Sequence, residues 1–205
     1  MANEQRARII EVAQKMFIEE GVKAVRMDDI AQAMGISKRT LYESFHDKEE
    51  LLYQAMLAHS ERHAENNMRI AASAPNVLVA VLLVLDSSAK DSETTWRVYN
   101  ALRRFYPATH DRLQNNSGAQ HTAEFKAALE QGKIDGLLTQ DLNIELSFSL
   151  LKYMASGVIH NANELALPNG ITRQEAFRYV MISFLRGIST SKGLEVIDKY
   201  IETIK

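Results

Sequence analysis

The chain has 205 residues, of which 46% are hydrophobic, enough for one large domain or for a small domain followed by a larger one. Its formal net charge of −2 is not that of a general polyanion binder, and the absence of cysteine excludes disulfides and thiol chemistry. The longest apolar run, residues 77–85, is too short for a membrane span of roughly 20 residues, and the charged N-terminus lacks a signal peptide's apolar core, so we expect a cytoplasmic protein.

Residues 4–20 are predicted to form an amphipathic helix that ends at Gly21. Its apolar stripe is made of Ile9, Val12, Ala13, Met16 and Phe17. Arg6 and Arg8 lie near its start. Each of them could contact a DNA backbone or simply be solvated, and the sequence favours neither interpretation.

Residues 27–45 have the pattern of two short helices joined by a tight turn. Gly35 can adopt the positive φ that ends the first helix, and the Ser37 side chain can cap the second. The second helix, residues 38–44, buries Leu41 and Phe45 and leaves Lys38, Arg39, Thr40, Tyr42 and Glu43 accessible to a partner. This is the signature of a helix-turn-helix, whose second helix fits a DNA major groove.

These residues resemble the N-terminal signature of the TetR family of bacterial transcriptional regulators. The positions that match in order and spacing are Ile30, Ala31, Gly35, Ile36, Ser37, Thr40, Leu41, Tyr42, Phe45, Lys48 and Leu51. The resemblance covers residues 5–57. It implies an all-α fold, with a three-helix DNA-binding domain at residues 1–47 and a larger helical domain for effector binding and dimerisation at residues 48–205.

One position departs from the family pattern. The family often has a threonine just before the first helix of the motif, where this chain has Arg26. Asp28 and Asp29 still complement the dipole of that helix, and the guanidinium is expected to contact a phosphate directly.

The residues expected to contact double-stranded DNA are Arg26, Ser37, Lys38, Arg39, Thr40, Tyr42, His46 and Lys48. Lys38 and Arg39 are the candidates for base or phosphate contacts, and Thr40 for a phosphate or a thymine methyl group. The resemblance implies phosphate contacts for the last three. Two such domains in a homodimer would bind a palindromic operator through helices roughly 34–36 Å apart.

Asp47 and Glu50 form a capping-box pattern that opens a long connecting helix, to about residue 71. His59 and His63 lie four residues apart on this helix, the spacing of a metal-binding pair. No third ligand of a suitable kind is evident, so we expect neither a metal nor another cofactor.

The remaining two thirds of the chain are predicted to form a helical bundle. Residues 75–89 make a helix that is apolar on nearly every side, and an aromatic-rich helix from residue 93 ends or kinks at Pro107. Residues 111–118 are the most loop-like segment and precede a helix at residues 120–131, which residues 132–136 break. Helices follow at residues 141–164, after the capping pair Thr172 and Glu175, and at residues 193–205.

The resemblance implies that this bundle binds a small effector. The candidate pocket residues are Trp96, Tyr99, Arg103, Phe125, Tyr153 and His160, although an ordinary core role explains each of them equally well. The two long helices before the last are too apolar to be covered within one subunit, which predicts a homodimer, and the corresponding pair forms the dimer interface in the family. The candidate interface residues are Leu150, Met154, Gly157, Val158, Phe177, Val180, Met181 and Phe184.

The sequence therefore predicts a DNA-binding transcriptional regulator that responds to a small molecule. Repression is implied by the family resemblance alone. The alternatives are a helical-bundle enzyme or a scaffold that binds only protein. The chain contains no Gly-x-Ser-x-Gly, Walker A, Gly-x-Gly-x-x-Gly or His-Glu-x-x-His motif, so we expect no enzyme.

Overall fold

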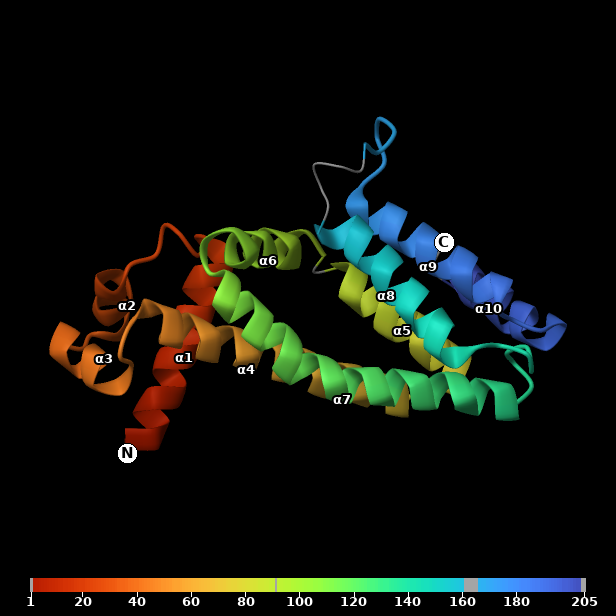
Figure 1. Ribbon diagram of the computed structural model, residues 1–205, viewed down its shortest axis with the longest axis horizontal. Helices are drawn as coiled ribbons and strands as arrows, with labels where there is room; N and C mark the ends of the chain where they lie inside the picture. Colours follow the sequence, from red (N-terminus) through yellow and green to blue (C-terminus); the bar gives the residue numbers. More distant parts are fainter. Residues whose placement is uncertain (1, 91, 161–165, 204–205) are drawn as a thin grey trace. The chain divides into compact units, whose positions relative to one another are not determined.

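The computed structural model describes the backbone of residues 2–90, 92–160 and 166–203, and within them all side chains except those of residues 2, 88–90, 92–96, 117–121, 155, 156, 159 and 160 (Figure 1). These ranges contain helices and no strand, which confirms the predicted all-α class. No helix among them is long and apolar enough to cross a membrane. The helices are α1 (Ala2–Glu19), α2 (Met27–Met34), α3 (Lys38–Ser44), α4 (Lys48–Ala72), α5 (Val77–Lys90), α6 (Ser92–Phe105), α7 (Pro107–Ile134), α8 (Ile144–His160), α9 (Arg173–Gly187) and α10 (Ser191–Thr203).

The chain divides into two compact units, and the first comprises Met1–Ala64 with Thr94–Gly118. Its core is built on the predicted apolar stripe of α1, where Ile9, Ala13 and Phe17 have no exposed surface. Val98, Leu102 and Leu113, from α6 and the start of α7, join the same core. The unit that holds the helix-turn-helix is therefore larger than the predicted domain of residues 1–47.

The second unit comprises Glu65–Glu93 with Ala119–Lys205. One buried cluster joins α5, the end of α7, α9 and α10 through Leu78, Leu82, Leu129, Leu185 and Ile197, among others. A second cluster joins α8 to α9. The cap of α9 is as predicted, because Thr172 accepts a hydrogen bond from the Glu175 N–H at 3.2 Å while its own N–H donates to the Glu175 carboxylate at 2.8 Å.

Close backbone packing joins the segment after α7 to the start of α10. Gly136, with φ of 68°, turns the chain, and the Thr190 N–H donates to the Leu137 carbonyl at 3.0 Å. A Cβ atom on Gly193 would lie 2.1 Å from that same carbonyl oxygen. Only glycine fits at this position without a backbone shift.

The prediction of a loop at residues 111–118 is wrong. In the structure α7 runs unbroken from Pro107 to Ile134, with proline at the first helical position, where no N–H is needed. The turn preference of Asn, Ser and Gly is worth at most about 1 kcal/mol per residue in a helix. Burial of Thr109 before the segment, of Leu113 within it and of Leu129 beyond it outweighs this preference. The predicted break after residue 131 is confirmed, since the helix ends at Ile134.

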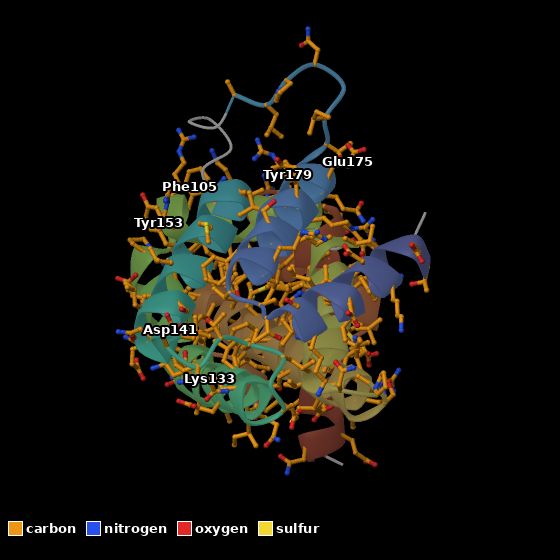
Figure 2. The ribbon with its side chains drawn as sticks, turned by 90° about the vertical axis from the view of Figure 1, so that its right-hand side faces the viewer. Phe105, Lys133, Asp141, Tyr153, Glu175 and Tyr179 are labelled. Atoms are coloured by element: carbon orange, nitrogen blue, oxygen red, sulfur yellow. The ribbon has the colours of Figure 1, made fainter. Side chains whose placement is uncertain are left out.

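The second unit also carries apolar side chains on its surface. Leu146, Leu150 and Tyr153 lie at helical spacing on α8 with exposed fractions of 56%, 47% and 77%. Tyr179 on α9 is 75% exposed. Figure 2 shows Tyr153 and Tyr179 at the outer surface of these two helices. Both helices thus carry apolar side chains inside the unit and others exposed on its surface.

Candidate nucleic-acid interface

The turn between α2 and α3 has the predicted geometry. Gly35 adopts φ of 64°, and its N–H donates to the carbonyl oxygens at the end of α2. Ser37 precedes α3 in an extended conformation, and its hydroxyl accepts a hydrogen bond from the Thr40 N–H at 3.1 Å. The hydroxyls of these two residues are also 2.8 Å apart. Both chain reversal and helix start are therefore fixed by local chemistry.

Helix α3 presents opposite faces to the core and to solvent. Leu41 and the adjoining Phe45 are buried against the core of the first unit. Lys38, Arg39, Tyr42 and Glu43 are exposed, with half of the Tyr42 side chain accessible. Thr40 is only half-buried. The exposed face carries hydrogen-bond donors and an aromatic ring, which can contact the bases and phosphates of a major groove.

Both cations on this face have carboxylate partners. The Lys38 ammonium pairs with Asp28 in the first turn of α2. The Arg39 Nε lies 2.8 Å from the Glu43 Oε1, one turn along the same helix. All four side chains are more than half exposed, so their pairing is weak and a phosphate or a base can compete for the cations.

Arg26 lies directly before α2. Its side chain makes no capping hydrogen bond, and its backbone N–H donates to the Asp29 carboxylate at 2.8 Å. The start of α2 thus has the backbone-to-Asp29 half of a capping box but no cap from the side chain of residue 26. The exposed guanidinium lies at a helix N-terminus, a favourable place for a phosphate.

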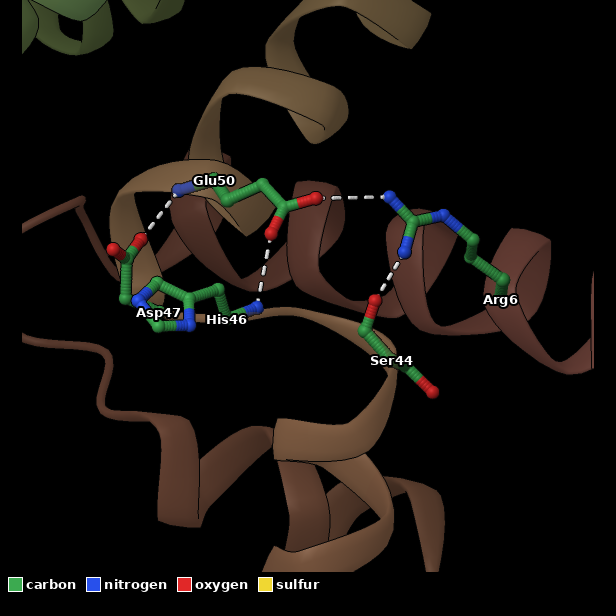
Figure 3. A network of polar contacts seen from close by, with 5 residues as sticks. All are labelled: Arg6, Ser44, His46, Asp47 and Glu50. Carbon is green, nitrogen blue, oxygen red and sulfur yellow. Dashed lines mark hydrogen bonds and ion pairs between the residues drawn. The ribbon is translucent and has the colours of Figure 1, made fainter.

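A network of polar contacts fixes the C-terminal end of α3 (Figure 3). The Arg6 guanidinium donates to the Ser44 carbonyl, pairs with Glu50 at 3.1 Å and lies 4.1 Å from the centre of the Phe45 ring. The other Glu50 oxygen accepts a hydrogen bond from the His46 N–H at 2.9 Å. These contacts give Arg6 a structural role inside the first unit, which neither a DNA-backbone contact nor simple solvation had anticipated. Its partner Ser44 lies 38 residues away, and the sequence contains no signal of this contact.

The start of α4 carries the last residues of the candidate interface. The Asp47 carboxylate accepts a hydrogen bond from the Glu50 N–H at 2.8 Å, as the capping-box pattern predicted. The Glu50 carboxylate, however, accepts its hydrogen bond from the His46 N–H instead of the Asp47 N–H. The hydrogen bond from His46 is the main cause that lowers the Glu50 pKa. Burial lowers the pKa of Lys48, whose ammonium lies 5.9 Å from the centre of the Phe17 ring, while Asp29 acts against this shift.

Residues 9–55 match the family model of bacterial regulatory proteins of the tetR family. A helix-turn-helix transcriptional regulator of Staphylococcus aureus (strain USA300) is 50% identical over 52 residues, which is 25% of this chain and 28% of that protein. Its counterpart in strain NCTC 8325 matches to the same extent. Residues 9–55 of this chain therefore carry the N-terminal DNA-binding domain of the TetR family. The chain spans little more than a quarter of the length of these curated relatives.

Solved structures share the fold over most of the chain. A TetR-family regulator from Cytophaga hutchinsonii superposes with a TM-score of 0.72 at 18% identity, covering 93% of this chain and 98% of that one. A regulator from Saccharomonospora viridis, solved in complex with choline, gives 0.75 at 17% identity and covers 92% and 99%. At identities of 17% and 18%, this likeness shows a shared fold only.

Four of the six candidate pocket residues have described side chains, and these four are divided between the two units. Tyr99 and Arg103 belong to the first unit, where Tyr99 contacts the His110 ring edge-to-face and has its pKa raised by burial. Phe125 and Tyr153 belong to the second, where Phe125 packs on Phe148 and Tyr153 is exposed. The side chains of Trp96 and His160 lie outside the described residues.

The second unit contains a small cavity, and none of the four candidate pocket residues with described side chains lines it. It lies between α5, α9 and α10, where Arg178 pairs with Asp86 beside the buried Tyr200. Burial, followed by the charge of Asp86, raises the Tyr200 pKa. The cavity is lined by Leu82, Leu85, Asp86, Arg178, Met181, Ile182 and Tyr200.

The eight candidate interface residues divide by burial. Val158, Phe177 and Met181 are covered by the packing of α8 on α9 inside the chain. Met154, Gly157, Val180 and Phe184 are half-buried, and Leu150 is exposed. Leu146 and Tyr153 on α8 and Tyr179 on α9 are also exposed, and the sequence did not single them out for this role.

Proposed function

We propose that this protein is a transcriptional regulator that inserts α3 into the DNA major groove. The observation that carries the proposal is the exposed arc of Lys38, Arg39 and Tyr42 on a helix whose two ends are fixed by the Ser37 cap and by the Arg6 network. A helix held in this way can place its donors against base edges reproducibly.

The other predicted contacts surround this helix. Arg26 lies at the start of α2, His46 follows α3, and Lys48 opens α4. In the proposed complex Arg26, Tyr42, His46 and Lys48 bind phosphates and set the position of the domain. Lys38 and Arg39 reach base edges, while Thr40 contacts a phosphate or a thymine methyl group beside the Ser37 cap.

The protein is proposed to act as a homodimer. The exposed apolar side chains of Leu146, Leu150 and Tyr153 on one face of α8, and of Tyr179 on α9, support this, because large exposed apolar side chains favour association. A two-fold axis would present two α3 helices to a palindromic operator, roughly 34–36 Å apart or at a multiple of that distance.

A small effector is proposed to control DNA affinity, and repression in its absence is the mode that the family resemblance favours. The complex of the Saccharomonospora viridis regulator with choline supports a small-molecule effector for a chain of this fold. A ligand that favours the non-binding conformation by about 1–3 kcal/mol changes the DNA affinity roughly 5- to 150-fold.

The test is selection of binding sites from a random-sequence duplex pool by the purified protein, followed by titrations at several salt concentrations. We expect an inverted repeat whose affinity falls steeply as salt rises, because bound Lys and Arg release counterions from the phosphates. Tyr42→Ala and Lys48→Ala should each weaken binding to all sequences. A protein that enriches no sequence would contradict the proposal and favour the enzyme or scaffold alternatives.

A further inference from the structure

Helix α3 carries an acidic side chain on its DNA-facing side. Successive helical residues are turned by about 100°, so Arg39, Tyr42 and Glu43 lie within an arc of about 100°. All three are exposed, and Glu43 has 61% of its side chain accessible. A partner that touches Arg39 and Tyr42 therefore meets Glu43 as well.

Helix stability does not account for this arrangement of charges. Lys38 and Arg39 occupy the first turn of α3, where the helix dipole favours acidic residues, and Glu43 occupies the last turn, where it favours basic ones. The order of the Arg39–Glu43 pair along the helix is also the less stabilising of the two. The charges oppose the preferences of the helix, so another constraint must fix them.

Contact with DNA supplies such a constraint. A carboxylate close to DNA is repelled by the phosphates, and in the major groove it finds a favourable partner only in a base amino group. Carboxylates accept hydrogen bonds from the cytosine N4 amino group, and an arginine binds the guanine O6 and N7 atoms in a bidentate manner.

We propose that Glu43 is a specificity-determining residue that selects cytosine. On specific DNA the Arg39 guanidinium leaves Glu43 for a guanine, and the freed carboxylate accepts a hydrogen bond from the N4 amino group of a cytosine at a nearby base pair. On other sequences Glu43 stays paired with Arg39, and its carboxylate remains close to the phosphates, which repel it. The inference rests on the proposed DNA-binding function and deepens it.

The experiment repeats the site selection with three variants of the full chain. The wild type should enrich a cytosine at one position of each half-site. Glu43→Ala should lose the preference at that position alone, a change of roughly 5- to 150-fold in discrimination. Glu43→Gln should shift the preference there to adenine, because a glutamine amide binds the adenine N6 and N7 atoms.

Asp28→Asn is the matched control. It also removes an exposed carboxylate that pairs with a cation of α3, but this residue lies on α2. It should raise the affinity for all duplexes to a similar extent and leave the selected sequence unchanged. Thermal unfolding of each variant checks that these exposed substitutions leave the fold intact.

Selection of the same sequence by the wild type and both Glu43 variants would overturn the role of Glu43 and leave the DNA-binding function in place. A uniform loss of affinity in Glu43→Ala, with no change in sequence, would show that Glu43 acts only by holding Arg39. Failure of the wild type to select any sequence would overturn the proposed function itself.

Discussion

The α2–α3 pair and the α8–α9 pair are both amphipathic helix pairs, but different kinds of residue fix them. The first depends on particular chemistry: a glycine at positive φ, a serine cap and an arginine that binds the end of the helix. The second depends on apolar packing, and its helices carry apolar side chains on two faces. A contact that requires one residue type can be predicted from a sequence. Which of two apolar faces is buried depends on packing, and the sequence does not show it.

The largest expected effect tests which face of α9 is internal. Met181 is 1% exposed and packs between α8 and α9. Met181→Ala should lower the free energy of unfolding by about 2–5 kcal/mol, because it removes buried methylene groups and leaves a cavity. Chemical denaturation followed by circular dichroism measures this. A loss below about 0.5 kcal/mol would place Met181 outside the core.

Tyr179→Ala is the matched substitution on the outer face of the same helix. Since its side chain is 75% exposed, the change should alter the stability of the single chain by no more than about 0.5 kcal/mol. It should instead weaken the proposed dimer, which sedimentation across a concentration series detects. Unchanged association would mean that this part of the outer face does not meet a second copy.

The sequence allowed the α2–α3 pair to be predicted almost residue by residue, because Gly35 and Ser37 have few alternative roles. It did not reveal that Arg6 binds the Ser44 carbonyl, since that contact depends on how α1 crosses α3. It gave the wrong structure for residues 111–118, where burial overrides turn preference. It also found apolar residues in α8 and α9 without showing which of them face inward.

A smaller effect is expected at Gly193, where backbone packing in the second unit depends on a single residue type. Gly193→Ala should destabilise the protein by about 1–3 kcal/mol, because the new Cβ would overlap the Leu137 carbonyl oxygen. Gly187→Ala is the control, since a Cβ there meets nothing within 4 Å. Equal melting temperatures for the two variants would show that the α10 contact relaxes freely.

The cap of α3 should have an effect of about 1 kcal/mol. Ser37→Ala removes the acceptor of the Thr40 N–H, and the loss should appear in the denaturation midpoint. Ser37→Asn should restore most of the stability, because asparagine caps helices about as well as serine. If asparagine failed to rescue the variant, the role of Ser37 in stability would not be that of a cap.

The smallest expected effect is the pH dependence that Glu50 adds to the first unit. Its pKa is lowered from that of an ordinary glutamate, first by the His46 hydrogen bond and then, against the effect of burial, by Arg6. The unfolded chain therefore binds more protons than the folded one, so this contribution is complete above the ordinary carboxyl pKa and disappears as the pH falls through the lower folded value. Because the pair is partly exposed, the contribution should be about 0.5 kcal/mol.

Glu50→Gln tests this by chemical denaturation at a series of pH values between neutral and acid. The variant should be less stable than the wild type at neutral pH, since the amide loses the charge that binds Arg6 and strengthens the His46 hydrogen bond. The difference should shrink as the pH falls, because the wild-type carboxylate becomes protonated. A difference that stays constant with pH would assign the effect of Glu50 to packing. The network that fixes the end of α3 would then depend on shape, as the α8–α9 pair does, and the contrast between the two helix pairs would not extend to this contact.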